Sequence, residues 1–143
     1  MSLTDQVPLG SGFGLRTEPQ EILQDANLSG KAFLVTGGYS GIGLETTRAL
    51  ARAGARVHVP VRSVERAAQS LVEVPGEVVV GQMDLAELDS VRAYAVRVKE
   101  LEPRLDVVIC NAGIMACPEK QVGNNWESQF AVNHLGHFVL VNE

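Results

Sequence analysis

The sequence lacks any long apolar segment. It has no uninterrupted run of about eighteen apolar residues, the shortest run that indicates a membrane-spanning helix. Its first residues also have no cationic segment followed by an apolar stretch, which is the pattern of a secretory signal. We therefore expect a cytoplasmic protein that does not associate with membranes.

Positive charge is also scarce. The 143 residues include 12 Lys and Arg against 17 Asp and Glu, giving a net charge of −5, and the two signs are interspersed. Proteins that bind nucleic acid present clustered Lys and Arg side chains to the phosphates. Because this sequence has no such cluster, we expect no nucleic-acid partner.

Cysteines are few, and complete sets of metal ligands are absent. Cys110 falls in an expected buried strand and Cys117 in the loop after it, so we expect two reduced thiols. His134 and His137 are three residues apart, as some metal ligands are. No Cys, Asp or Glu is spaced to complete such a site, so we expect no bound metal.

The chain does contain a regular alternation of apolar runs and helical patterns. Its 45% hydrophobic content fits one α/β domain or part of one. The alternation predicts parallel βαβ units with right-handed crossovers. We expect a three-layer, Rossmann-type doubly wound parallel sheet, truncated after its fourth strand and helix. The expected strands span residues 32–35, 56–61, 77–83 and 105–110, and the expected helices span 41–53, 64–71, 90–100 and about 125 onward.

Local signals set the expected element ends. Residues 1–28 should form an arm with one short helix, because the first part is rich in glycine and small residues. Thr17 is the expected N-cap of that helix, with Gln20 as its capping-box partner. Ser63 is expected to cap the helix at 64–71, and Asn124 or Asn125 is expected to cap the last helix.

Three further expectations concern the faces and ends of elements. Pro60 cannot donate to a ladder, so the second strand should end just before it or bulge there. Helical spacing predicts that Ile42 shares a buried stripe with later apolar residues of its helix. The same reasoning puts Phe130 and Phe138 on one buried face of the last helix.

A glycine-rich turn joins the first strand to the first long helix. Residues 34–43 read Leu-Val-Thr-Gly-Gly-Tyr-Ser-Gly-Ile-Gly. The glycines at 37, 41 and 43 let the backbone turn sharply and approach a ligand, and the helix start offers unpaired N–H groups to an anion. The spacing differs from G-x-G-x-x-G, and no Gly-Lys-Ser/Thr follows. We therefore predict a phosphate-binding turn that is neither of those two loops.

Two motifs together resemble a known family. Residues 36–43 match the T-G-x-x-x-G-I-G pattern of short-chain dehydrogenases/reductases, and Asn111-Ala112-Gly113 matches their N-A-G signature. The runs 111–116 and 133–138 are most similar to the retinol-dehydrogenase-like group of that family. The resemblance covers residues 29–143 and implies an incomplete NAD(P)-binding Rossmann half-domain. The implied activity is hydride transfer between a nicotinamide cofactor and a small-molecule alcohol or carbonyl.

The resemblance also assigns roles to individual residues. Asp84, with the backbone of Leu85 beside it, would accept from the adenine amino group, and a turn-forming role for Asp84 is the alternative. Asn133 would position a water that relays protons to the catalytic lysine. Asn111 could contact the cofactor or serve only as a structural hydrogen-bonding group. The remaining implied cofactor contacts are Thr36, Gly37, Tyr39, Ser40, Gly41, Ile42, Gly43, Ala112, Gly113 and Ile114.

Arg62 follows the second strand, where many dinucleotide folds carry an acidic residue for the ribose 2′-OH. A guanidinium pairs bidentately with a phosphate, whereas it cannot accept from a free diol. Arg62 therefore favours NADP as the cofactor, with NAD still possible. The alternative is that Arg62 is a solvated loop cation.

The family's catalytic Tyr-x-x-x-Lys pair is missing. The tyrosines are Tyr39 and Tyr94, and the residue four places after Tyr94 is Val98. The chain also ends inside an amphipathic helix without a stop signal. We expect the amino-terminal, cofactor-binding half of a longer enzyme that forms a homo-oligomer when its domain is complete. The alternative is a non-catalytic dinucleotide-binding or interaction module, or a fragment.

Overall fold

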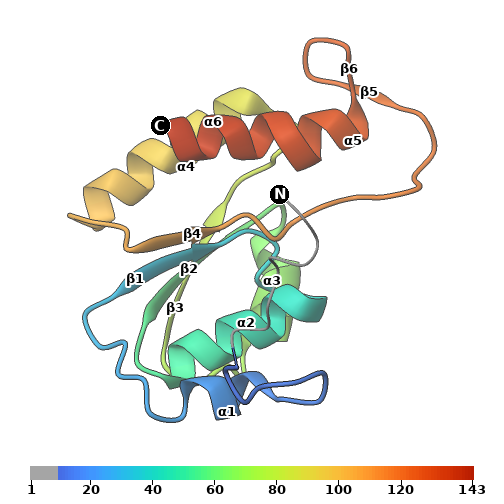
Figure 1. Cartoon of the computed structure of the whole chain (residues 1–143). Coiled ribbons are helices and arrows are strands. Elements are labelled where there is room, and N and C mark those ends of the chain that lie inside the picture. The colour runs from blue at the N-terminus through green and yellow to red at the C-terminus, as the bar shows by residue number, and fades with distance from the viewer. Residues whose placement is uncertain (1–9) are drawn as a thin grey trace.

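The computed structural model describes residues 10–143, so the first nine residues of the expected arm lie outside the described part. Four parallel strands form one sheet in the order β3-β2-β1-β4. Figure 1 shows α1, α2 and α3 on one face of this sheet and α4 and α6 on the other, which confirms the three-layer parallel fold. The strands are β1 (Ala32–Val35), β2 (Arg56–Val61), β3 (Glu77–Gln82) and β4 (Val107–Ile109). The helices of these layers are α1 (Pro19–Leu23), α2 (Gly41–Arg52), α3 (Val64–Leu71), α4 (Leu88–Leu101) and α6 (Gly136–Asn142).

The chain between β4 and α6 leaves the sheet. It forms a small antiparallel hairpin of β5 (Gln121–Val122) and β6 (Trp126–Glu127). Helix α5 (Ser128–Phe130), the π-helical turn η2 (Ala131–Leu135) and α6 then follow without interruption, and Figure 1 shows them as one long helix. This long helix brings the end of the chain back over α4.

Two apolar clusters hold the three layers together, one on each face of the sheet. On one face, Val57 and Val59 of β2 pack with Leu50 of α2 and Leu71 of α3. On the other face, Leu34 of β1 packs in a cluster with residues of α4 and with Leu140 of α6. All four residues of β1 are buried, as expected for a central parallel strand covered on both faces.

The second strand continues through Pro60, so the expected break there is wrong. Strand β2 is in register with β1 only as far as the Leu34–His58 pair, whereas its register with β3 includes Pro60 and Gly81. At Pro60 the strand therefore has a neighbour on one side only. A proline that faces no second strand costs the sheet no ladder hydrogen bond.

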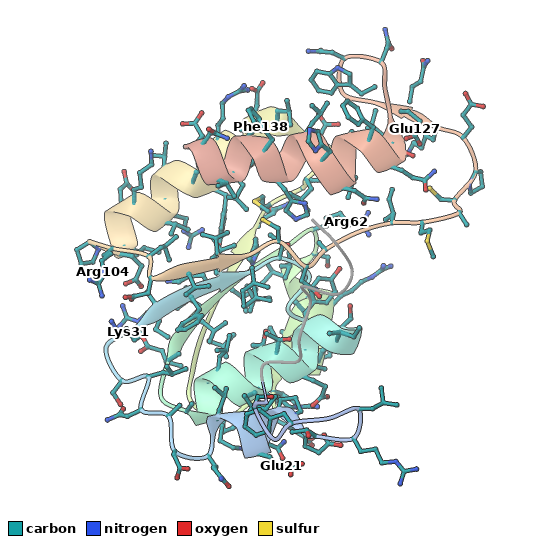
Figure 2. All side chains as sticks on the ribbon, in the orientation of Figure 1. Glu21, Lys31, Arg62, Arg104, Glu127 and Phe138 are labelled. Carbon is teal, nitrogen blue, oxygen red and sulfur yellow. The ribbon has the colours of Figure 1, made fainter. Side chains whose placement is uncertain are left out.

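Two of the three expected helix caps are also wrong. Ser63 caps α3 as expected, since its side chain accepts from Arg66 N. Helix α1 uses Glu18 as N-cap, with Glu21 as its capping-box partner, instead of Thr17. The last helix is capped by Glu127, whose carboxylate accepts from two backbone amides, because the hairpin turn holds the asparagines before it. Glu127 lies at the start of α5 in Figure 2.

Three apolar side chains expected inside are exposed. Ile42 is 82% exposed, Phe130 is 51% exposed, and Phe138 is 59% exposed on the side of α6 away from the sheet (Figure 2). Helix α6 instead buries His137 and Leu140. The wider turn of η2 rotates the residues after it relative to a regular helix, so the inward face differs from that given by helical spacing.

Cys110 is also exposed, because β4 is an edge strand that ends at Ile109. Both cysteines are free. No helix within residues 10–143 is long and apolar enough to cross a membrane. The boundary expected between residues 28 and 29 stays a prediction, although Leu23 of α1 and Leu28 pack against the cluster beneath β2.

Candidate functional site

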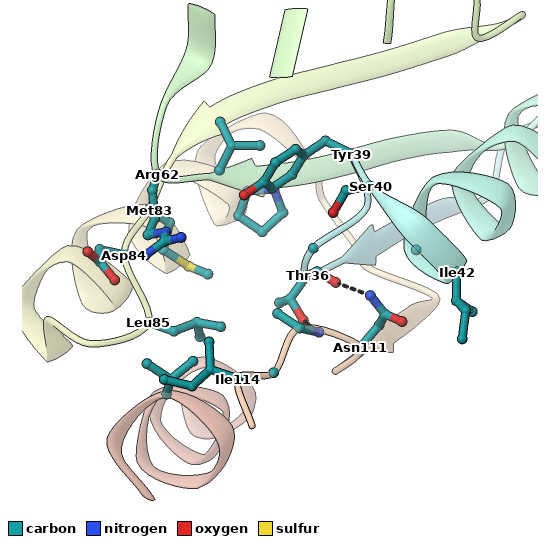
Figure 3. A pocket seen from close by; sticks show the side chains of 17 residues that line it. Thr36, Tyr39, Ser40, Ile42, Arg62, Met83, Asp84, Leu85, Asn111 and Ile114 are labelled. Carbon is teal, nitrogen blue, oxygen red and sulfur yellow. Dashed lines mark hydrogen bonds between the residues drawn. The ribbon is translucent and has the colours of Figure 1, made fainter. Parts of the chain in front are cut away.

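A cavity of about 350 Å³ opens at the carboxyl ends of the parallel strands, and we call it the cleft (Figure 3). Every residue that the sequence implied as a cofactor contact lines it, except Gly41. Sequence reasoning missed four lining residues, namely Pro60, Val61, Met83 and Val132. Each lies one or two positions before an implied residue in the sequence. Including the last residues of each expected parallel strand would therefore have found most of them.

The glycine-rich turn forms one wall of the cleft. Gly37 and Gly41 have φ values of +67° and +52°, the left-handed region in which a Cβ is disfavoured. A Cβ on Gly43 would collide with the carbonyl oxygen of Gly37 and with the amide of Asn111. The start of α2 therefore lies directly against the turn, its Ile42 and Gly43 line the cleft, and no side chain caps its first amides.

The second motif is tied to the first by hydrogen bonds. Asn111 Nδ2 donates to the carbonyl oxygen of Thr36 at 2.9 Å, and Ala112 N donates to Thr36 Oγ1 at 3.0 Å. These bonds join the end of β4 to the end of β1. The structural role that the sequence left open for Asn111 is thus present, and its side chain also lines the cleft.

Arg62 and Asp84 line the same part of the cleft, opposite the start of α2 in Figure 3. Arg62 is exposed and has no ion-pair partner among residues 10–143. Asp84 Oδ1 accepts from Ala86 N at 2.9 Å, which is the turn-forming role considered from the sequence. Its second carboxylate oxygen makes no hydrogen bond within the described chain, so the turn leaves an acceptor at the cleft.

Asn133 lies behind the cleft wall and does not line the cavity. Its Oδ1 accepts from Ile114 N at 2.8 Å, and its Nδ2 donates to the Ile114 carbonyl oxygen at 2.8 Å. Both polar atoms of the side chain are therefore engaged in fixing Ile114, which does line the cleft. The water-positioning role implied for Asn133 stays a prediction.

The two tyrosines have different surroundings, and only Tyr39 lines the cleft. Tyr94 is buried against Gly81, and burial raises the pKa of its phenol far above the usual range. Tyr39 lines the cleft within the glycine-rich turn, beside Ser40 (Figure 3). The described residues therefore supply the walls of a binding site and no evident acid.

The two histidines of the last helix have different surroundings. His134 is exposed and stacks between two phenylalanines, with ring centroids 5.3 Å from Phe130 and 6.3 Å from Phe138. His137 is buried and hydrogen-bonded to Thr36. Over residues 10–143 there is no group of three or more His, Cys, Asp or Glu side chains that could hold a metal ion.

The chain is similar to named proteins over most of its length. A family model described as short chain dehydrogenase matches residues 31–143. Short-chain dehydrogenase/reductase prx1 of Penicillium roqueforti is 45% identical over 116 residues, which cover 80% of this chain and 34% of that protein. Human retinol dehydrogenase 13 is 39% identical over 122 residues, which cover 82% of this chain and 37% of that protein.

A solved structure shares the fold at lower identity. The Pseudomonas aeruginosa RhlG/NADP active-site complex is 32% identical with a TM-score of 0.70, covering 81% of this chain and 47% of that one. The chain thus spans about a third of the length of the two curated relatives and about half of this structure. The family match includes both motifs of the cleft. On these grounds, the chain belongs to the short chain dehydrogenase family.

Proposed function

We propose that this chain is the cofactor-binding half of an NADP-dependent enzyme that interconverts an alcohol and a carbonyl compound. The observation that carries the proposal is the cleft, which joins a glycine turn, a helix start and the Arg62 guanidinium at the ends of parallel strands. Open α/β sheets bind their ligands at this edge. The RhlG structure of similar fold is a complex with NADP, which supports the same ligand here.

The walls of the cleft fit a dinucleotide. A Cβ on Gly43 would collide with the turn, and one on Gly37 would be crowded at a positive φ, so the glycines let the backbone amides at the start of α2 approach a pyrophosphate. Asp84 and Leu85 would flank the adenine, and Ile114 would flank the nicotinamide. The bound cofactor supplies or accepts the hydride, and the residues of this chain bind and orient it.

Arg62 supports NADP over NAD. Its guanidinium is exposed at the cleft and has no anionic partner within residues 10–143, so it is available to a 2′-phosphate. A ribose diol would instead need an acceptor at this position, and the guanidinium offers only donors.

The test is a calorimetric titration of the 143-residue chain with NADPH and with NADH, repeated for Arg62→Asp. We expect the variant to bind NADPH roughly 10- to 100-fold more weakly, as loss of a charge-assisted pair predicts, and NADH almost unchanged. Arg66→Asp is the control, because Arg66 is an exposed cation of α3 outside the cleft. Equal effects of the two variants would refute the assignment of Arg62.

A second candidate function is a dinucleotide-binding module without catalytic activity. The sequence feature that favours it is the absence of a Tyr-x-x-x-Lys pair from the 143 residues. The intact mass of the protein isolated from its source discriminates the two. A native mass near 15.3 kDa with NADPH binding and no turnover supports the module. A larger protein whose further sequence carries Tyr-x-x-x-Lys supports the enzyme.

A further inference from the structure

One buried histidine lies between the first motif and the helix that follows the second motif. His137 of α6 is 7% exposed, and its Nε2 lies 2.8 Å from Thr36 Oγ1. Its Nδ1 lies 3.2 Å from the carbonyl oxygen of Asn133. Thr36 is the first residue of the first motif, whereas Asn133 fixes the residue that follows the second motif. The ring therefore bridges the first motif and the helix behind the second.

The partners of the ring determine its tautomer. A carbonyl oxygen only accepts hydrogen bonds, so Nδ1 of His137 must carry the proton that points to Asn133. In a neutral imidazole the other nitrogen is then an acceptor, and the Thr36 hydroxyl donates to it. Thr36 Oγ1 keeps a free lone pair, which accepts from Ala112 N. The Thr36 hydroxyl also lies 3.4 Å from the carbonyl oxygen of Ile109, but its contact of 2.8 Å with His137 Nε2 is shorter and takes the hydroxyl hydrogen in this tautomer.

The hydrogen bonds form a closed circuit that begins at Ala112 and returns to the chain at Ile114. They run from Ala112 N to Thr36, from Thr36 to His137, and from His137 to Asn133. The Asn133 side chain then binds both main-chain groups of Ile114, two residues after Ala112. The segment 112–114, which lines the cleft, is thus held from both of its ends.

His137 does not line the cleft itself, so its effect on a ligand is indirect. We propose that His137, as the Nδ1–H tautomer, is a positioning residue that locks segment 112–114 to the glycine-rich turn and thereby sets the affinity for the dinucleotide. This statement about affinity rests on the proposed function. The tautomer and the position of the segment do not depend on it.

Three substitutions distinguish the effects of the two hydrogen bonds that the His137 imidazole makes. His137→Asn keeps a donor near the Nδ1 position and loses the acceptor for Thr36. His137→Gln reaches the Nε2 position with an acceptor and loses the bond to Asn133. His137→Phe keeps a ring of similar size and loses both bonds. His134→Asn is the matched control, since His134 lies on the same helix and is exposed.

The experiment combines ¹⁵N NMR of the imidazole with NADPH titration of the full chain. We expect an unprotonated Nε2 and a protonated Nδ1 in the neutral ring. We expect His137→Phe to weaken NADPH binding roughly tenfold and to shift the amide signals of Ala112 and Ile114, which corresponds to the loss of about one or two hydrogen bonds. Partial recovery in His137→Asn or His137→Gln, and no change in His134→Asn, complete the expected pattern.

Two results would overturn the proposal. One is a neutral ring protonated on Nε2. The other is a His137→Phe protein that folds, melts at a lower temperature and binds NADPH as tightly as the original chain, which is the behaviour of a residue that only supports the fold. If the unsubstituted chain does not bind NADPH, the proposed function fails, and the amide shifts of Ala112 and Ile114 still decide whether His137 positions the segment.

Discussion

The side chain of Asn133 binds the backbone of Ile114 as a neighbouring strand would. Its amide oxygen accepts from Ile114 N and its amide nitrogen donates to the Ile114 carbonyl oxygen, both at 2.8 Å. Ile114 lies just after β4, the edge strand of the sheet, where the ladder no longer supplies partners. The asparagine on η2 therefore satisfies main-chain groups at the cleft wall that would otherwise be left to solvent.

Replacing Asn133 should weaken the fold. Asn133→Ala removes two hydrogen bonds, so the free energy of unfolding should fall by about 1–3 kcal/mol. Asn133→Asp keeps the acceptor for Ile114 N but places a second oxygen, in place of the Nδ2 donor, against the Ile114 carbonyl oxygen. At neutral pH it should therefore destabilise the fold at least as much as Asn133→Ala. Urea denaturation followed by circular dichroism measures both. Asn124→Ala, at an exposed hairpin turn, is the control, and equal stability of all four proteins would contradict the account.

Gly43→Ala should damage the cleft. A Cβ at this position would collide with the Gly37 carbonyl oxygen and the Asn111 amide, so the turn and the start of α2 must separate. Overpacking of this kind costs about 1–3 kcal/mol of stability. We expect that loss in denaturant titrations, together with weaker NADPH binding. Gly14→Ala, which has open space around the added Cβ and no positive φ, should leave both quantities unchanged.

An ionic network away from the cleft, in which His58 and Glu102 are buried, predicts how stability changes at acid pH. His58 Nε2 lies 2.7 Å from Glu102 Oε1, and Arg56 bridges Glu102 to Glu77. Burial raises the pKa of Glu102, but hydrogen bonds from His58 and Arg56 outweigh it and hold the pKa below the ordinary value of 4.5. A folded-state pKa below the unfolded one gives stability that is present above 4.5 and lost as the pH falls through the folded value.

Glu102→Gln should therefore flatten the decline of stability on acidification. The measurement is the free energy of unfolding at a series of pH values from neutral to below the ordinary glutamate pKa. The variant should be less stable than the original chain at neutral pH and should lose less on acidification. Glu119→Gln, at an exposed loop position, serves as the control. The role given to Glu102 is wrong if the free energy of unfolding of both variants falls with pH in parallel with that of the unsubstituted chain.

Local sequence patterns predicted the strands and the glycine-rich turn well. The bounds of β1 and β2 match the expected runs 32–35 and 56–61, although the break expected at Pro60 is absent, because a strand buried on both faces is an apolar run that ends where polar turn residues begin. Ser63 was found as a cap because its hydrogen bond is to a residue three positions on. These features depend on a few neighbouring residues.

Features that depend on distant packing were not predictable in this way. Helical spacing placed Phe138 inside, but the π-helical turn before it changes the inward face, and nothing in local propensity indicates such a turn. The bond between Thr36 and His137 joins residues 101 positions apart. The sequence indicated which residues the cleft contains, whereas the links that hold its walls require the folded arrangement.

The central claim is that the cleft binds a nicotinamide dinucleotide, and the most direct test is the ¹H–¹⁵N spectrum of the labelled chain during titration with NADPH. The account predicts saturable shifts of the amide signals of residues 37–43 and 112–114, with no shift in the hairpin at 121–127. It would be contradicted by a spectrum that does not change at millimolar NADPH. Shifts confined to the hollow between α1 and α2, around Gln24 and Arg52, would contradict it equally.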